Sequence, residues 1–270
     1  MTDLIYEKLD NGVAILTMNR PARKNALSPE MLCRLVDAWE DFDRDSNMRV
    51  ALLTGAQGVG AFCAGADLGL LVPLLTGSRG PENEWDERMV ADPDILYRAL
   101  QRNNPTYKPI IAAVNGFAIA GGTEFLQGTD IRIAVPGATF GLAEVKHGLA
   151  PGGGSLTRLA RQMPYAKAMQ ILLTGDVIDA DEALRIGFIN EIVAEDQLMV
   201  RAREIADKIA GNGPLAVRAC KEAVIRTNGL PLNEAYVIED EIANRILATE
   251  DAVEGPRAFL EKRKPVFRAC

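Results

Sequence analysis

Short apolar runs alternate with helical patterns through about the first 190 residues of this 270-residue chain. The runs expected to be strands are Ile5–Glu7, Val13–Met18, Val50–Leu53, Pro109–Val114 and Ile131–Val135. A strand that joins its parallel neighbour needs a long crossover connection, which is usually helical. The alternation therefore predicts an α/β fold with crossover connections.

Local signals mark the first hairpin and the first helix. The turn Asp10–Gly12 joins the first two expected strands and is a strong hairpin signal. Ser28 is suited to cap a helix, and Pro29 is suited to its first position. Apolar residues then recur at helical spacing, which predicts one buried face. That face consists of Leu32, Leu35, Val36, Trp39 and Phe42.

The C-terminal part of the chain has a different pattern. From Asp196 onward the signal is almost entirely helical, and Gly211–Pro214 and Asn228–Pro231 divide it into three expected helices. We expect residues 1–195 to form the core with the ligand site. Residues 196–270 are expected to form a helical extension that packs on the core or on another subunit.

The segment from Leu70 to Leu100 is expected to be irregular. It begins apolar, turns at Gly77–Pro81 and then becomes charged. A long excursion of this kind is typical of a lid or a binding loop. A disordered surface insert is the alternative.

Composition excludes several classes of protein. The chain has 30 Lys and Arg against 37 Asp and Glu, and its net charge of -7 argues against a general nucleic-acid surface. With His147 as the one histidine, a histidine-rich metal site is not expected. The N-terminus lacks a secretory pattern, and no apolar run is long enough to span a bilayer. We therefore expect a cytoplasmic protein with reduced thiols at Cys33, Cys63, Cys220 and Cys270.

Two glutamates stand in otherwise apolar stretches. Glu124 ends the segment Asn115–Glu124, and Glu144 ends the segment Thr139–Glu144. A carboxylate in such surroundings is costly unless it is paired, hydrogen-bonded or used. Two carboxylates that face one cavity could hold a water molecule and pass protons in both directions.

Small residues form turns at two places after expected strands. One is Gly55–Leu68, and the other is Ala120–Gly122. Small side chains let a ligand approach the backbone, where free N–H groups can bind developing negative charge. Two such N–H groups can form an oxyanion hole. Either turn alone is a weak signal, because such stretches are often merely tight turns.

Together these segments resemble the crotonase family, the enoyl-CoA hydratase/isomerase superfamily. The resemblance runs in order from about residue 5 to residue 267. The segments that carry it are Asn19–Leu27, Ala61–Leu68, Ala113–Glu124, Phe140–Glu144, Pro151–Gly154, Leu173–Asp176, Ala183–Asn190 and Phe259–Phe267.

The resemblance implies a spiral of ββα units with a helical C-terminal region used in trimer formation. It implies a homotrimer, commonly doubled to a homohexamer, and an acyl-CoA thioester as the ligand. The oxyanion hole maps onto the N–H groups of Ala66 and Gly121, which would bind the thioester carbonyl. No metal, redox cofactor, nucleic acid or membrane partner is implied, because CoA enters as part of the substrate.

Glu124 and Glu144 occupy the two positions that carry glutamate in enoyl-CoA hydratases. We therefore expect hydration of a trans-2-enoyl-CoA to a 3-hydroxyacyl-CoA, in fatty-acid or related acyl catabolism. Glu124 would take a proton from water, and Glu144 would give a proton to the α-carbon. The reverse assignment stays open, because close carboxylates titrate as a pair. The alternatives are an isomerase or specialised dehydratase on the same scaffold, or a non-catalytic acyl-CoA binding protein.

The resemblance also suggests residues that bind substrate. Arg23 and Lys24 would lie near the CoA phosphates, and Lys262 would reach a phosphate bound by a neighbouring subunit. A solvated surface charge is an equal alternative for each. Ala64, Asp67, Leu68 and Gly122 flank the oxyanion turns, and Asp67 is expected to shape its turn.

Four further positions carry smaller expectations. Ala120 and Thr123 depart from the family pattern, in which the first position is commonly glycine. Cys63 is expected to be a packed thiol rather than a nucleophile. His147 is expected to cap a turn at the surface, with contact to the ligand as the alternative.

Overall fold

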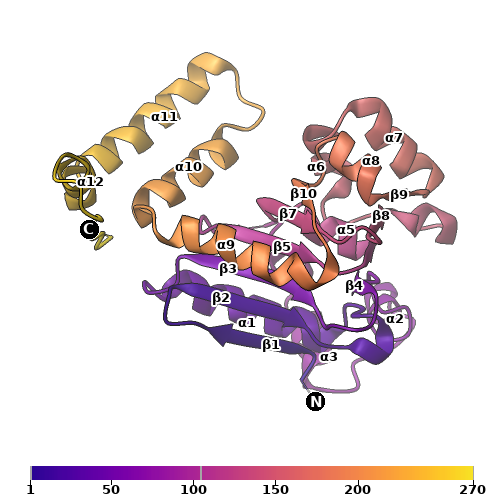
Figure 1. The fold of residues 1–270 in the computed structure, drawn as a ribbon. Coiled ribbons are helices and arrows are strands. Elements are labelled where there is room, and N and C mark those ends of the chain that lie inside the picture. Colours follow the sequence, from indigo (N-terminus) through magenta and orange to yellow (C-terminus); the bar gives the residue numbers. More distant parts are fainter. Residues whose placement is uncertain (1, 104, 270) are drawn as a thin grey trace.

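Two β-sheets form the centre of the structure, a computed structural model that describes residues 2–103 and 105–269 (Figure 1). The larger sheet has six strands in the order β1-β2-β3-β5-β7-β10. The first pair is antiparallel, and the other neighbours are parallel. The strands are β1 (Leu4–Lys8), β2 (Val13–Met18), β3 (Val50–Gly55), β5 (Ile110–Val114), β7 (Ile131–Ala134) and β10 (Glu191–Ile192).

The smaller sheet has four strands in the order β4-β6-β8-β9. They are β4 (Ala61–Cys63), β6 (Phe117–Ile119), β8 (Thr139–Gly141) and β9 (Val177–Asp179). The successive pairs β3–β4, β5–β6 and β7–β8 each give one strand to each sheet, which winds the chain into a spiral. The predicted α/β class with crossover connections is confirmed. The strands of the smaller sheet were not predicted, because segments of three residues show no measurable alternation.

Helix α1 (Pro29–Arg44) begins where its sequence signals predict. The Ser28 hydroxyl accepts a hydrogen bond from the Met31 N–H at 3.0 Å, and Pro29 occupies the first turn. Every residue of the predicted apolar face is buried. The hairpin of β1 and β2 is also confirmed.

The segment expected to be irregular contains three short helices. They are α2 (Leu71–Thr76), α3 (Glu84–Ala91) and α4 (Ile95–Ala99). The charged turn before α3 is ordered by Asp86, which is buried and forms an ion pair with Arg79 at 2.5 Å. The side chain of Asn83 caps α3 by accepting hydrogen bonds from the N–H groups of Trp85 and Asp86. The prediction of irregular structure was wrong, as was the alternative of a disordered insert.

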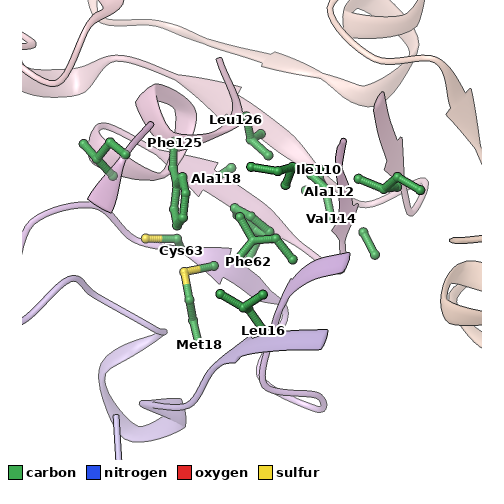
Figure 2. Close-up of a cluster of buried hydrophobic side chains, with 14 of the residues drawn as sticks. Leu16, Met18, Phe62, Cys63, Ile110, Ala112, Val114, Ala118, Phe125 and Leu126 are labelled. Carbon is green, nitrogen blue, oxygen red and sulfur yellow. The ribbon is translucent and has the colours of Figure 1, made fainter. Parts of the chain in front are cut away.

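Helix α5 (Gly121–Leu126) is buried along its whole length. It packs on a cluster in which Phe62 of β4 is surrounded by side chains from β2, β5, β6 and α5 (Figure 2). The neighbours labelled there are Leu16, Met18, Cys63, Ile110, Ala112, Val114, Ala118, Phe125 and Leu126. The first residues of α5 are therefore fixed by the core between the sheets.

Three helices cover the smaller sheet at one end of the molecule (Figure 1). They are α6 (Ser155–Gln162), α7 (Tyr165–Thr174) and α8 (Ala180–Arg185). Short 3-10 helices, which connect larger elements, are η1 (Pro21–Arg23), η2 (Ala143–His147) and η3 (Glu195–Gln197).

The C-terminal region has four helices where the sequence predicted three. They are α9 (Leu198–Ala210), α10 (Pro214–Thr227), α11 (Leu232–Leu247) and α12 (Glu250–Leu260). The missed boundary lies at Thr249, whose side chain accepts a hydrogen bond from the Ala252 N–H and caps α12. Helix α9 packs on the larger sheet, whereas α10 to α12 extend away from it (Figure 1). The division at residue 195 stays a prediction.

Candidate functional site

A cavity of about 300 Å³ lies among β4, α5, η2, α2 and α4. It brings together several of the residues that the sequence singled out. Those that line it are Ala64, Ala66, Leu68, Ala120, Gly121, Glu124, Glu144 and His147. The glycine-bearing turns and both glutamates, which are far apart in sequence, therefore face one space.

The two turns approach each other closely. Leu27 pairs with Ala66 as in a parallel sheet, because its N–H donates to the Gly65 carbonyl and its carbonyl accepts from the Asp67 N–H. This pairing directs the Ala66 N–H away from Leu27. Neither that N–H nor the one of Gly121 donates to another described residue. A Cβ atom at Gly65 would lie 3.1 Å from Gly121 N, so the two turns are in contact.

Packing fixes the backbone at the start of α5. Gly122 lies against β4, where a Cβ atom would come within 2.4 Å of the Cys63 carbonyl oxygen. It does not line the cavity, so its place in the structure requires a small residue for packing. Ala120 has φ 51° and ψ -123°, a conformation that normally needs glycine. The Thr123 hydroxyl donates to the Ala118 carbonyl at 2.6 Å and accepts from the Gly141 N–H, which joins α5 to β6 and β8.

Glu124 is 5% exposed and is surrounded by hydrogen-bond donors. Its Oε1 accepts a hydrogen bond from the Ser155 N–H at 3.2 Å. Burial raises the pKa of Glu124, while hydrogen bonds from Ser155 and the Gly153 N–H, and the charge of Arg102, act in the opposite direction. A Cβ atom at Gly153 would lie 2.7 Å from Glu124 Oε2, so only glycine leaves room for the carboxylate.

Glu144 has a different environment. Its Oε2 atom is buried and finds no hydrogen-bond partner among residues 2–103 and 105–269. Burial and then the nearby charge of Glu124 raise the pKa of Glu144 to about 7, against a hydrogen bond from its own backbone N–H. The site therefore places a carboxyl group that is readily protonated near neutral pH beside one that is held by donors.

Comparisons with known proteins agree with this geometry. The enoyl-CoA hydratase/isomerase family profile matches residues 8–269. The chain belongs to the enoyl-CoA hydratase/isomerase family. The resemblance predicted from the sequence is confirmed, and the fold is the crotonase fold.

Relatives in this family align with nearly the whole chain. Enoyl-CoA hydratase EchA19 of Mycobacterium tuberculosis is 46% identical over 94% of this chain and 92% of its own length. The short-chain-enoyl-CoA hydratase of Clostridium acetobutylicum is 37% identical over 98% of this chain and 97% of its own. The crystal structure of an enoyl-CoA hydratase from Bacillus anthracis is 34% identical, with a TM-score of 0.88 over 99% of this chain and all of that one.

Asp67 lies behind the first turn rather than in the cavity of this family member. Its Oδ1 accepts hydrogen bonds from the N–H groups of Gly69 and Leu70, and its Oδ2 lies 2.9 Å from Arg20 Nη1. Arg20 also donates to the Ala26 carbonyl at 2.6 Å. The predicted role of Asp67 in shaping the turn agrees with these contacts. Arg20 was missed, because its partners lie far apart in sequence.

The predicted phosphate-binding cations do not line the cavity. Arg23 is exposed at the end of η1, and Lys24 follows it with its Nζ donating to the Val59 carbonyl at 2.9 Å. Lys262 is exposed and follows α12, a helix that lies at the other end of the molecule from β4 and α2 in Figure 1. Their contacts with substrate stay predictions.

The apolar wall of the cavity was not predicted residue by residue. It is formed by side chains of α2, of α4 and of the residue that follows α4, all within the segment expected to be irregular. These side chains are Leu71, Val72, Leu75, Thr76, Leu96 and Leu100. Period-3.6 spacing of Leu71, Leu74 and Leu75 was the available signal, but a helix this short gives it weakly.

Two further expectations can be compared with the structure. His147 is exposed, as expected, but it also lines the cavity. Cys63 is fully buried, burial raises its pKa to about 12, and its sulfur accepts the Gly65 N–H, which suits a packed thiol. Cys33 and Cys220 are also free, and Cys270 lies outside the described residues.

Metal-binding and membrane-spanning features were also sought. Within the described ranges, no group of three or more His, Cys, Asp or Glu side chains could hold a metal ion. No helix in the part of the chain that the structure describes is long and apolar enough to cross a bilayer.

Proposed function

We propose that this chain is an enoyl-CoA hydratase, a hydro-lyase that adds water to a trans-2-enoyl-CoA to give a 3-hydroxyacyl-CoA. One observation carries the proposal: Glu144, whose Oε2 has no hydrogen-bond partner among the described residues, lines the same cavity as Glu124 and as Ala66 and Gly121, the residues with unbonded N–H groups. An acid, a base and an oxyanion-binding pair are the groups that hydration needs.

The first step uses the backbone donors. The thioester carbonyl accepts hydrogen bonds from the N–H groups of Ala66 and Gly121, which stabilise negative charge on its oxygen. Removing one such donor typically lowers the rate by about 100- to 1000-fold. The turns are held by packing, so the donors are arranged before the substrate binds.

The second step uses the carboxyl groups. Glu124 takes a proton from water as the water oxygen bonds to the β-carbon, and the π electrons move to the thioester oxygen. The electrons return as Glu144 gives its proton to the α-carbon. One water is then added across the double bond, and the pair recovers its starting state by moving the proton from Glu124 to Glu144. The raised pKa of Glu144 suits the acid, and the donors around Glu124 suit the base.

The lining of the cavity supports an uncharged acyl group. Among the described residues that line it, the only acidic side chains are Glu124 and Glu144, and there is no Lys or Arg. Leucine and valine side chains of α2 and α4 make up the wall. A carboxylate on the acyl chain would find no Lys or Arg partner among these lining residues, and burying it there would be unfavourable.

We also propose that the protein self-associates through its C-terminal helices, as a trimer or a hexamer. Large apolar side chains are exposed on α11 and α12, including Leu247, Phe259 and Leu260 at 73%, 83% and 80%. An apolar surface of this kind is typical of an interface. Light scattering after size exclusion would give the subunit number, and a monomer at micromolar concentration would refute the proposal. CoA within the substrate is the only cofactor proposed, and the cytoplasmic location stays a prediction.

The direct test is loss of absorbance of the conjugated enoyl thioester on mixing the protein with crotonyl-CoA and longer 2-enoyl-CoAs. Wild-type protein should consume the substrate and form the 3-hydroxyacyl-CoA. Glu144→Gln should be slower by about 100- to 10,000-fold, because general acid catalysis contributes that much. A 3-enoyl-CoA in parallel would reveal an isomerase. Tight binding without turnover of any thioester would instead indicate a binding protein.

A further inference from the structure

A row of buried polar side chains lies behind Glu124, outside the cavity. Gln127 is 3% exposed, and Ser155 is fully buried. Gln127 Nε2 donates a hydrogen bond to Ser155 Oγ at 2.6 Å, and the Ser155 N–H donates to Glu124 Oε1 at 3.2 Å. The row therefore joins α5 to the first residue of α6 and ends at the carboxylate.

The direction of these hydrogen bonds follows from the contacts of Gln127. Its Nε2 also donates to the Thr123 carbonyl at 3.3 Å. A carbonyl can only accept, so the amide group that lies near both Thr123 and Ser155 must be the NH₂ group. Ser155 Oγ is consequently an acceptor from Gln127. Its own hydrogen is then available to Glu124, whose Oε1 accepts a hydrogen bond from the N–H of the same serine. A hydrogen bond from this hydroxyl lowers the pKa of Glu124 against the rise that burial causes.

The far end of the row is fixed as well. The backbone carbonyl of Gln127 accepts from Gln162 Nε2 at 2.9 Å, and Gln162 Oε1 accepts from Arg132 Nη2 at 2.8 Å. Arg132 is itself 8% exposed, and its other groups donate to carbonyls such as that of Phe188. These bonds hold Gln127 at its backbone carbonyl and its NH₂ group, while its Oε1 has no partner among the described residues, so Ser155 Oγ receives a donor that is held in place.

We propose that Ser155, held by Gln127, is a positioning residue that donates its hydroxyl proton to Glu124 and keeps that carboxylate ionised and aimed at the reacting water. This inference rests on the proposed hydration. It extends the proposed function to two residues that do not line the cavity and that no motif singled out.

Other charged groups near Glu124 act in known directions. Arg102, which donates to the Gly152 carbonyl at 2.7 Å and stacks on Tyr97, favours the ionised carboxylate. The charge of Glu124 in turn raises the pKa of Glu144, and His147 lines the same cavity. Because these groups are unchanged in Ser155 variants, a change in the titration of Glu124 there would come from the hydroxyl.

The pH dependence of kcat/KM tests the proposal in Ser155→Ala. Activity is lost at low pH when Glu124 becomes protonated. Without the hydroxyl donor the ionised form of Glu124 is less favoured, so the acid limb of the profile should move up by about one pH unit. At pH values below that limb, kcat should be about tenfold lower than in wild type. KM should stay within about twofold, because Ser155 does not contact substrate. Ser155→Thr, which keeps a hydroxyl, should restore the wild-type limb.

Two further variants make the test specific. Thr157→Ala is the matched control, because its hydroxyl lies on the same helix but donates to the Gly154 carbonyl. It should leave the limb in place. Gln127→Leu alone should produce a smaller shift of the limb than Ser155→Ala. The double variant should show no more shift than Ser155→Ala alone, because Gln127 acts through the Ser155 hydroxyl. An unmoved limb in Ser155→Ala, or an equal shift in Thr157→Ala, would overturn the proposal.

Failure of the proposed function would give a different result. If wild-type protein hydrates no enoyl-CoA, the proposed reaction is wrong, and the position of Ser155 can still be tested by NMR. The ¹³C carboxyl signal of Glu124, assigned with Glu124→Gln, should titrate about one unit higher in Ser155→Ala than in wild type. Equal titration in the two proteins would refute the role of Ser155, whatever the reaction is.

Discussion

The two glutamates of the site belong to regions that are built in opposite ways. Every residue of α5, which carries Glu124, is buried, whereas no residue of η2, which carries Glu144, is fully buried. Glu124 is surrounded by donors from the core, and Glu144 has a buried oxygen without a hydrogen-bond partner among the described residues. Two residues of one type thus have different surroundings: burial raises the pKa of both, but only at Glu124 do donors from neighbouring residues oppose the rise.

Packing explains the contrast. In α5, Phe125 is fully buried and meets the Trp39 ring edge to face, with centroids 6.4 Å apart. In η2, Val145, Lys146 and His147 are exposed, and Gly148 ends the helix with positive φ. The difference teaches that Glu124, the proposed base, is part of the core, while Glu144, the proposed acid, lies on a short element that the core does not enclose.

The largest expected effect separates the two roles directly. Exchange of the α-proton of butyryl-CoA in D₂O needs a base at the α-carbon and the oxyanion donors, but no water attack. Glu144→Gln should lose this exchange by at least about 100-fold, because the group that carries the α-proton is gone. Glu124→Gln should keep it within about tenfold. Mass spectrometry of the thioester measures the exchange, and the opposite ranking would reverse the assignment.

The packing contrast predicts a large difference in stability. Phe125→Ala should lower the free energy of unfolding by about 3–5 kcal/mol, because it leaves a cavity in the core. Leu149→Ala, at a residue 41% exposed just beyond η2, should change it by less than about 0.5 kcal/mol. Urea denaturation gives both values. Comparable losses would mean that the two regions are equally enclosed.

Glycine substitutions test how tightly Glu124 is held. A Cβ atom at Gly153 would lie 2.6 Å from Leu100 Cδ1 and 2.7 Å from Glu124 Oε2. Gly153→Ala should therefore displace the carboxylate and reduce kcat/KM on the order of 100-fold. The control is Gly152→Ala, where the added atom meets nothing within 4 Å. Equal activity of the two variants would show that the position of Glu124 is not critical.

The smallest effect concerns stability and pH. A folded-state pKa of about 7 for Glu144 means that the folded protein binds this proton more tightly than the unfolded chain does. That contribution is fully present below about pH 4.5 and is lost as pH rises through 7. Glu144→Gln should therefore be more stable than wild type at about pH 8, by about 1–2 kcal/mol after allowance for partial exposure, with no gain near pH 4. A pH-independent difference in thermal unfolding would contradict this.

Much of the fold was predictable from local signals. The strands of the larger sheet are apolar runs of four or more residues, and α1 has both a Ser28 cap and a continuous apolar face. The smaller sheet could not be predicted, because its three-residue strands are stabilised by pairing across the spiral. The turn that precedes α3 is held by the Arg79–Asp86 ion pair, a contact that periodicity does not reveal.

Those residues of the site that belong to a sequence motif could be predicted from the sequence. Glu124, Glu144, Ala66 and Gly121 come together as the resemblance implied, although their roles are proposals. The polar residues behind them were not predictable. Ser155 reaches Glu124 across 31 residues of sequence, a contact that only tertiary folding creates.

The central claim is that the two carboxyl groups differ in proton affinity because of their surroundings. Titration of ¹³C-labelled glutamate carboxyls by NMR tests it most directly, with Glu124→Gln and Glu144→Gln used to assign the signals. Burial raises the pKa of Glu144 to about 7, and it also raises the pKa of Glu124, where hydrogen bonds from Ser155 and Gly153 oppose the rise. From these donors we expect Glu124 to titrate at a lower pH than Glu144. Titration of Glu124 above Glu144, or of both near the ordinary glutamate value, would contradict the account.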